Sequence, residues 1–146
     1  WHVYHQCGKL DLEEVKSFYL RSGLNYTVKD FFPNIEDYYN RASIIISRSG
    51  ALTVSEILHF GKPSIFLPLP WAIDNHQFHN AMHLSSIGLS EVVEAKDENL
   101  DILTQKLQKI ISSKEKRDKM SDAAKLYEKR DSISIIISSL YESFNK

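Results

Sequence analysis

Cysteine, glycine and long apolar runs are all scarce in this chain of 146 residues. A single cysteine, Cys7, allows no internal disulfide and favours a reducing compartment. No apolar run approaches the ~20 residues that a membrane span needs. A net charge of −1 gives no electrostatic reason to expect nucleic acid as a partner. The chain also lacks an initial Met, and its first residues already have a strand pattern, so we expect that it starts inside a longer chain.

Several familiar site motifs are missing as well. There is no Gly-x-Gly-x-x-Gly and no Walker phosphate loop, which excludes those two nucleotide fingerprints. No Gly-x-Ser-x-Gly elbow supports a serine hydrolase. Three histidines, His76, His79 and His83, raise the question of zinc, but no glutamate or cysteine completes a familiar zinc pattern. We therefore expect neither a metal nor a cofactor.

Short apolar runs alternate with helical patterns along the chain. The runs predict five strands, at residues 3–5, 26–28, 43–46, 64–67 and 91–93. Helices are expected between them, and a helical tail from about residue 99 contains a last segment, 133–144, for which a strand over 133–137 is the alternative. This alternation predicts one α/β domain over residues 1–146 with a mainly parallel sheet. The run 43–46 has the composition of a strand covered on both faces.

Helix ends carry recognisable signals. Asp11 with Glu14 fits a capping box, and Asp74 is a candidate N-cap for a helix over residues 76–86. Gly61 and Pro63 predict the end of a helix over residues 53–60. Because ligands bind at the carboxyl ends of parallel strands, the loops after Ile46 and Leu67 are the first candidates for a site.

The loop after Ile46 suits a nucleoside diphosphate. A helix that begins beside small residues offers unpaired N–H groups and a partial positive charge to phosphate. Arg48 adds a full positive charge, and Glu56 can accept two hydrogen bonds from a vicinal diol. The alternative stays open that Thr53 and Glu56 only form a capping box and that Arg48 is a surface ion-pair residue.

The loop after Leu67 leads into a helix that carries two amide side chains. Gln77 and Asn80 are three residues apart, so they share a helix face. Amides both donate and accept, which suits sugar hydroxyls. Trp71 fits stacking on a ring and fits a core or lid role equally well.

These segments together resemble the C-terminal domain of the MurG family. The resemblance is carried by residues 47–57, Gly61-Lys62-Pro63, residues 68–70, 74–77 and Asn80-Ala81, and further by His5-Gln6 with Gly8 and by residues 28–35. It covers residues 1–94 and, more loosely, the helical tail. Members of this family transfer N-acetylglucosamine from UDP-GlcNAc to lipid I and so make lipid II for peptidoglycan.

The resemblance implies a GT-B fold, in which this chain is the Rossmann-like C-terminal half that binds the donor. Glu56 is then expected to hold the ribose, residues 51–53 the diphosphate and sugar, and Gln77 with His76 the GlcNAc hydroxyls. The backbone at Phe32 is expected to contact uracil beside Phe31. The predicted substrate-binding residues are Phe32, Arg48, Ser49, Gly50, Ala51, Leu52, Thr53, Glu56, His76, Gln77 and Asn80.

The resemblance also implies what lies elsewhere. The catalytic base, the lipid I site and the membrane-contacting patch are expected in the family's N-terminal domain, so no catalytic residue is assigned here and the fragment alone is expected to be inactive. The family's glycine-rich loop that helps to hold phosphate is absent from this sequence. The complete enzyme is expected to be an inverting transferase, cytoplasmic and peripheral on the inner face of the bacterial plasma membrane. Two alternatives remain, namely a donor-binding subunit of a two-subunit GlcNAc transferase and a non-catalytic nucleotide-binding module.

Overall fold

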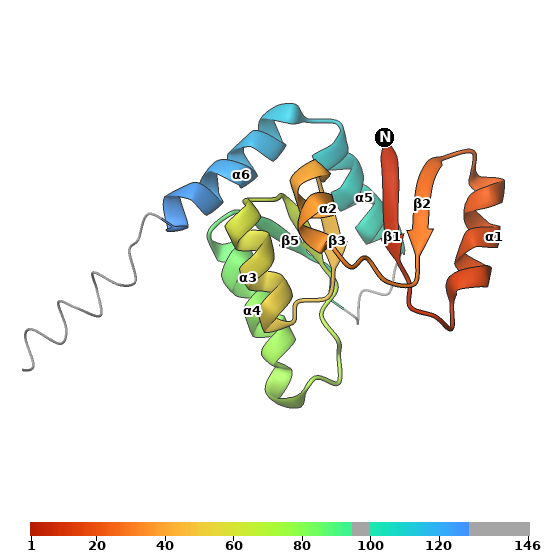
Figure 1. Ribbon diagram of the computed structural model, residues 1–146. Coiled ribbons are helices and arrows are strands. Elements are labelled where there is room, and N and C mark those ends of the chain that lie inside the picture. The colour runs from red at the N-terminus through yellow and green to blue at the C-terminus, as the bar shows by residue number, and fades with distance from the viewer. Residues whose placement is uncertain (95–99, 129–146) are drawn as a thin grey trace, which may run out of the picture. The chain divides into compact units, whose positions relative to one another are not determined.

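The computed structural model describes residues 1–94 and 100–128, and Figure 1 shows the elements that they form. Two compact units divide the chain, Trp1–Arg41 and a second unit that starts at Ala42. Each unit is described by itself. The predicted last helix over residues 133–144, and its alternative as a strand, lie outside the described residues.

The first unit contains two parallel strands joined by a helix. β1 (His2–Gln6) is followed by α1 (Leu12–Ser22), β2 (Asn25–Lys29) and α2 (Ile35–Arg41). The strands pair in register from His2 opposite Asn25 to Gln6 opposite Lys29. Gly23 ends α1 with φ 70°, a left-handed conformation that glycine adopts without a steric cost. This βαβ connection places the ends of β1 and β2 at the same edge of their sheet.

Aromatic rings pack on both faces of this small sheet. Because successive strand residues point to opposite faces, Tyr4 meets Tyr38 of α2 with ring centroids 5.1 Å apart, whereas His5 meets Tyr19 of α1. The Tyr19 hydroxyl also lies 3.2 Å from His5 Nδ1. Phe32, just before α2, packs against Tyr38 with centroids 4.0 Å apart. These contacts give the first unit its core.

The second unit is a three-stranded parallel sheet with helices on both sides. β3 (Ile45–Ser47), β4 (Ser64–Phe66) and β5 (Ser90–Val92) lie in that order. They alternate with α3 (Ala51–Phe60), a short 3-10 helix η1 (Ile73–Asn75) and α4 (His76–Ser86), and are followed by α5 (Leu100–Ile111) and α6 (Lys114–Glu128). The observed order of elements confirms the predicted parallel α/β fold.

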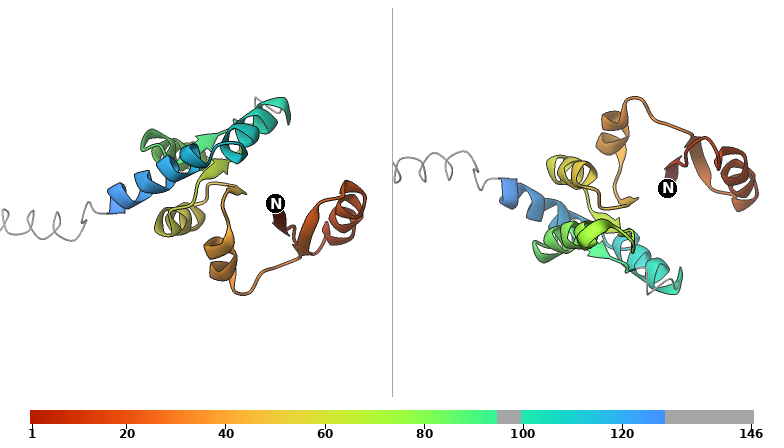
Figure 2. Two further views of the ribbon diagram at one scale, coloured as in Figure 1. Left: turned by 90° about the horizontal axis from the view of Figure 1, so that it is seen from above. Right: turned by 90° about the horizontal axis from the view of Figure 1, so that it is seen from below.

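The central strand β4 is the most buried part of the sheet. Its three residues, Ser64, Ile65 and Phe66, are fully buried. Ile65 packs in one apolar cluster with Val93, Ile110 of α5 and Met120 of α6. The helices α3 and α4 lie side by side, as Figures 1 and 2 show. α6 contacts α3 as well as α5, and β3 at the edge of the sheet is less covered than β4.

Ion pairs connect the two C-terminal helices to the sheet. Glu91 of β5 accepts hydrogen bonds from Lys106 Nζ of α5 (2.8 Å) and Lys116 Nζ of α6 (2.7 Å). Burial by itself would raise the pKa of the Glu91 carboxyl, but hydrogen bonds and charges from the two lysines outweigh it and hold the pKa below its ordinary value. This carboxylate therefore links β5 to both helices.

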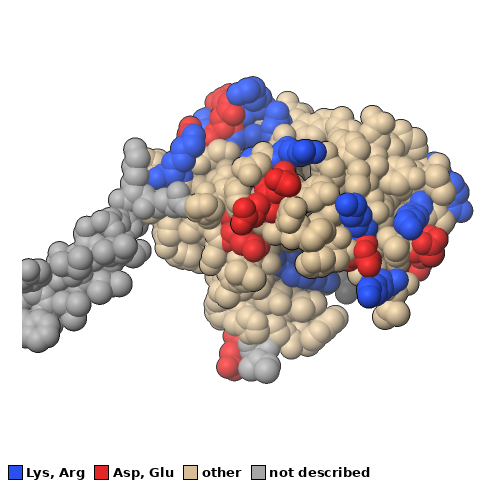
Figure 3. Space-filling view, viewed as in Figure 1, with Lys and Arg blue, Asp and Glu red and all other residues tan. Residues whose placement is uncertain are grey.

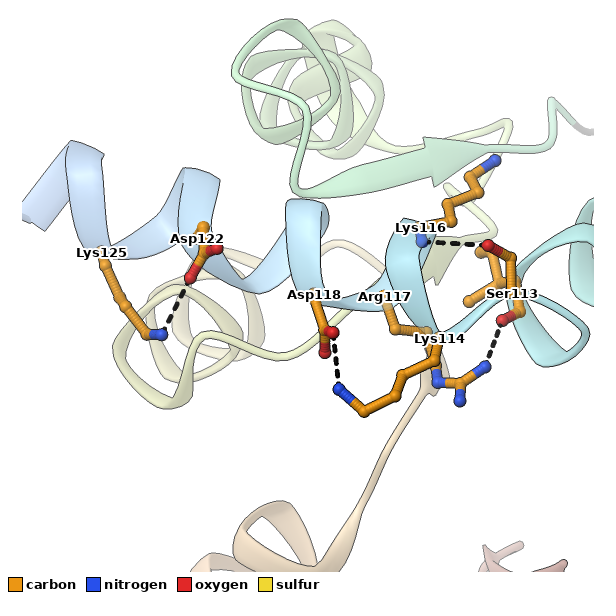
Figure 4. Close-up of polar contacts among 8 residues, drawn as sticks. Ser113, Lys114, Lys116, Arg117, Asp118, Asp122 and Lys125 are labelled. Atoms are coloured by element: carbon orange, nitrogen blue, oxygen red, sulfur yellow. Dashed lines mark hydrogen bonds and ion pairs between the residues drawn. The ribbon is translucent and has the colours of Figure 1, made fainter.

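The turn between α5 and α6 is stabilised by its own side chains (Figure 4). Arg117 Nη1 donates to the carbonyl oxygens of Ile110 and Ile111 at the end of α5, both at 2.7 Å. Ser113 Oγ accepts the N–H of Lys116 at 3.1 Å and so satisfies a donor at the start of α6. Figure 3 shows acidic and basic side chains next to each other over α6, consistent with pairs such as Lys114–Asp118. No helix within the described ranges is both long and apolar enough to span a bilayer.

Two local predictions are wrong. The strand predicted at residues 43–46 starts at Ile45, and Ile46 is 45% exposed, because β3 is an edge strand of its sheet. The predicted capping box at the start of α1 does not form, since Asp11 makes no side-chain cap hydrogen bond. Its carbonyl oxygen instead accepts the N–H of Val15 at 2.9 Å.

We predict that Ile65→Ala destabilises the protein by about 2–5 kcal/mol, because it leaves a cavity in the most buried strand. Urea unfolding of the native and variant chains measures this change. Leu126→Ala removes the same kind of apolar side chain from a position that is 68% exposed and should have little effect. Equal losses in the two variants would contradict the assigned core.

We also predict that Glu91→Gln lowers the free energy of unfolding at pH 7 by about 1 kcal/mol, as for a part-buried ion pair. The folded pKa of Glu91 is depressed, so its contribution is present above the ordinary value of 4.5 and is lost as the pH falls through the ordinary and then the folded pKa. Urea midpoints at pH 7 and pH 3 test this. Glu115→Gln, in a fully exposed pair, is the matched control with the smaller effect. A difference between native and Glu91→Gln that persists unchanged at pH 3 would contradict the assignment.

Candidate functional site

Two loops of the second unit lie at the carboxyl ends of neighbouring strands. Residues 48–50 connect β3 to α3, and residues 67–72 lead from β4 toward η1 and α4. β3 and β4 pair in parallel, and the N–H of Leu67 donates to the carbonyl oxygen of Ser47 at 2.9 Å. Both loops therefore begin at one edge of one sheet, which is where parallel α/β folds bind ligands.

The start of α3 presents backbone donors without a competing side-chain acceptor. Gly50 is the N-cap, with φ −62° and ψ 149°, and makes no side-chain cap hydrogen bond. The first turn contains no acidic residue, and the N–H of Val54 is the donor to the Gly50 carbonyl oxygen, at 2.9 Å. The N–H groups of Ala51, Leu52 and Thr53 precede the first such bond, so they have no acceptor inside the helix. This end of α3 is suited to an anion.

The capping-box alternative for Thr53 and Glu56 is wrong. It required Thr53 to be the N-cap, but α3 begins at Ala51, so Thr53 lies inside the first turn. The small side chains at residues 49–51 allow the helix to start two residues before the predicted position. Glu56 then lies in the second turn, on the same face as Leu52 and Thr53. Its side chain is half-buried.

Ser49 joins the first loop to the start of α4. It is fully buried, and its Oγ–H donates to the carbonyl oxygen of Gln77 at 2.7 Å. In return Asn80 Nδ2 donates to the carbonyl oxygen of Ser49 at 3.1 Å. Ser49 thus contacts the backbone of Gln77 and the side chain of Asn80, two residues that lie three apart on α4.

Two further side chains bind the second loop. Arg48 Nη1 donates to the carbonyl oxygen of Leu67 at 2.7 Å, and the guanidinium group remains exposed. Gln77 Oε1 accepts the N–H of Leu69 at 3.1 Å. Four predicted substrate-binding residues, Arg48, Ser49, Gln77 and Asn80, thus connect the two loops to each other. This structural role was not predicted from the sequence. Each of the four side chains bonds a backbone atom, and a backbone atom leaves no trace in residue identity.

The start of α4 has an unusual backbone. Asp74 and Asn75 adopt φ 52° and 51°, a left-handed conformation that is tolerated by Asp and Asn better than by most residues. The predicted N-cap at Asp74 is wrong, because Asn75 is the N-cap and makes no side-chain cap hydrogen bond. The kink turns the chain sharply before His76. Backbone strain of this kind is concentrated at functional sites.

Exposed side chains surround these loops. Leu52 at the start of α3 is 74% exposed and Trp71 is 78% exposed, so the core role considered for Trp71 is wrong. His76 is exposed as well. His83, one of the three histidines considered for zinc, lies 2.9 Å from the Tyr127 hydroxyl of α6. Within residues 1–94 and 100–128, no group of three or more His, Cys, Asp and Glu side chains is placed to hold a metal ion.

Phe32 belongs to the first unit. Its ring is buried, and its backbone N–H donates to Gln6 Oε1 at 2.8 Å. Phe31 beside it is 63% exposed, and its N–H donates to Asp30 Oδ1 at 2.9 Å. The uracil contact at the Phe32 backbone stays a prediction. Gln6 carries part of the family resemblance but was not among the predicted substrate-binding residues, although it lies at the end of β1.

These features define a class of protein, a Rossmann-like α/β domain with helix starts and polar side chains gathered at the carboxyl edge of a parallel sheet. Residues 1–136 match the glycosyltransferase family 28 C-terminal domain, and the chain belongs to that family. This confirms the family predicted from the loop motifs.

Curated relatives share one description, UDP-N-acetylglucosamine–N-acetylmuramyl-(pentapeptide) pyrophosphoryl-undecaprenol N-acetylglucosamine transferase. The protein from Shewanella woodyi is 39% identical over 125 residues, which are 84% of this chain and 34% of that protein. The protein from Sulfurihydrogenibium sp. is 45% identical over 84 residues, 58% of this chain and 24% of that protein. The chain therefore spans about a third or less of the length of the curated relatives it matches.

Solved structures agree with the fold. MurG of Acinetobacter baumannii superposes with a TM-score of 0.73 and 31% identity, covering 84% of this chain and 35% of that one. The glycosyltransferase VinC, in complex with dTDP, gives a TM-score of 0.64 at 18% identity over 88% of this chain and 36% of that one, and so supports the fold alone. The predicted fold, a Rossmann-like C-terminal half of a GT-B glycosyltransferase, is confirmed.

We predict that Gly50→Ser changes the free energy of unfolding by less than about 0.5 kcal/mol, because serine is a favoured N-cap and a Cβ at Gly50 meets open space. Gly61→Ser is the contrasting variant. Gly61 has φ 58°, and its Cβ would lie 3.6 Å from Ala124 Cβ, so we expect a loss of about 1 kcal/mol or more. Urea unfolding compares the two. A large loss at Gly50 would show that this glycine is required by the fold and is not reserved for a ligand.

Proposed function

We propose that this chain is the donor-binding part of a transferase that takes N-acetylglucosamine from UDP-GlcNAc. The observation that carries the proposal is the start of α3, where Gly50 leaves the first N–H groups without a side-chain cap and the first turn has no acidic residue. The descriptions shared by the curated relatives support the choice of donor. An anion site of this kind fits a diphosphate.

The other predicted contacts follow from that placement. The N–H groups of residues 51–53 donate to the diphosphate, and Arg48 adds positive charge nearby. Glu56, one turn further along α3, accepts hydrogen bonds from the two ribose hydroxyls. Gln77 and His76, at the start of α4, are the proposed contacts to the sugar. In this proposal neutral N–H donors and one guanidinium bind the diphosphate.

The proposed reaction is a single inverting displacement in the complete protein. A hydroxyl of lipid I attacks the anomeric carbon, the bond from that carbon to the diphosphate oxygen breaks, and UDP leaves. Hydrogen bonds and the α3 dipole stabilise the charge that develops on the diphosphate. No catalytic base is assigned among the residues of this chain. We place the complete protein in the cytoplasm, peripheral on the inner face of the plasma membrane, where lipid I is accessible.

The activity is tested with the complete protein, labelled UDP-GlcNAc and lipid I. We expect labelled lipid II, and no transfer from UDP-glucose at the same concentration. Binding of UDP-GlcNAc without transfer would favour a non-catalytic nucleotide-binding module. Transfer that requires a second protein would favour the two-subunit alternative.

We predict that Glu56→Gln weakens UDP binding by about 1–3 kcal/mol, because it removes charge-assisted hydrogen bonds to the ribose. Calorimetry with UDP and with 2′-deoxy-UDP makes the test specific. The loss caused by Glu56→Gln should be smaller for the deoxy ligand, which lacks one of the proposed partners. Glu13→Gln, on an exposed carboxylate of α1, is the matched control. Equal losses for both ligands would remove Glu56 from the ribose site.

A further inference from the structure

Gln77 is held through both of its carbonyl oxygens. Its backbone oxygen accepts the Ser49 hydroxyl at 2.7 Å, and its side-chain Oε1 accepts the Leu69 N–H at 3.1 Å. The first bond comes from the loop after β3 and the second from the loop after β4. One residue at the start of α4 is thus fastened to both loops, and its side chain is half-buried.

The bond to Leu69 decides which end of the Gln77 amide is left for another partner. A backbone N–H can only donate, so the atom opposite it must be the acceptor Oε1 and not Nε2. The amide NH₂ takes no part in that bond. Gln77 therefore offers a ligand a hydrogen-bond donor, and it suits an acceptor oxygen on that ligand.

Ser49 and Asn80 keep this arrangement in place. Ser49 is fully buried, and Asn80 Nδ2 donates to its carbonyl oxygen at 3.1 Å while its own hydroxyl donates to Gln77. The polarity of Asn80 is set in the same way, because a carbonyl oxygen can only accept. Gln77 and Asn80 lie one turn apart on α4, so the bonds to Ser49 fix the rotation of that turn relative to the first loop.

We propose that Ser49 and Asn80 are positioning residues which, together with the Leu69 N–H, preset Gln77 as a hydrogen-bond donor to an acceptor oxygen of the donor sugar. The inference rests on the proposed function, because it concerns the sugar of the bound UDP-sugar. In this inference Ser49 and Asn80 act on the ligand by holding Gln77 in place. The sequence pattern instead predicts that both residues contact the ligand directly. The sugar group read by Gln77 is then a hydroxyl or acetamide oxygen.

The test measures the ratio of the Kd for UDP-GlcNAc to the Kd for UDP, by calorimetry on the complete protein. Gln77→Glu keeps an acceptor for Leu69 but replaces the amide NH₂ donor with a carboxylate oxygen. Asn80→Asp keeps the shape of Asn80 but removes the donor to Ser49, and Ser49→Ala removes only the hydroxyl. We expect each variant to raise the ratio about fivefold to tenfold, the loss of roughly one hydrogen bond to the sugar. Gln108→Glu, on an exposed turn of α5, is the matched control and should leave the ratio unchanged.

The outcomes separate this inference from the proposed function. A native protein that binds neither UDP nor UDP-GlcNAc overturns both. If the native protein binds UDP-GlcNAc and Gln77→Glu alone raises the ratio, the positioning role of Ser49 and Asn80 is overturned. Parallel losses of UDP and UDP-GlcNAc, accompanied by a lower Tm, would likewise overturn it in favour of a purely structural role. Because Ser49→Ala deletes a single oxygen, it remains informative if Asn80→Asp fails to fold.

Discussion

The parallel pairing of β3 with β4 is the constraint on which the candidate site depends. Parallel strands end at the same edge, so the loops that follow them start side by side. The bond from the Leu67 N–H to the Ser47 carbonyl oxygen continues the pairing to the last residue of β3. Had the strands been antiparallel, the start of α3 and the polar residues of α4 would lie at opposite edges of the sheet.

Burial on both sides of β4 keeps this pairing rigid. Ile65 anchors the strand against α5 and α6, and the Glu91 carboxylate ties the next strand to the same two helices. The C-terminal helices therefore stabilise the sheet, and α6 also contacts α3 and, through Tyr127 and His83, α4. Their contribution to the site is indirect, because they fix the strands from which both loops emerge.

The polar side chains at the site have two kinds of role. Ser49, Asn80 and the Oε1 of Gln77 satisfy backbone groups that would otherwise be left without partners when the loops are packed together. The N–H groups at the start of α3 are in contrast left without helical acceptors, as a phosphate-binding site requires. These hydrogen bonds fix the conformation of the two loops. The N–H groups that remain without an acceptor are therefore held in a fixed geometry.

The sequence by itself determined the alternation of strands and helices, the parallel pairing of the strands, the family and the two loops of the candidate site, because apolar periodicity and the segments 47–57 and 74–77 are local patterns. It placed the helix ends less well. Asp11, Thr53 and Asp74 all have cap chemistry, yet none forms a side-chain cap, since where a helix begins depends on the turn that delivers the chain. Only the tertiary structure decided that Ser49 bonds Gln77 and that Leu69 sets the amide, because hydrogen bonds to backbone atoms across 28 and 8 residues of chain leave no signal in residue identity.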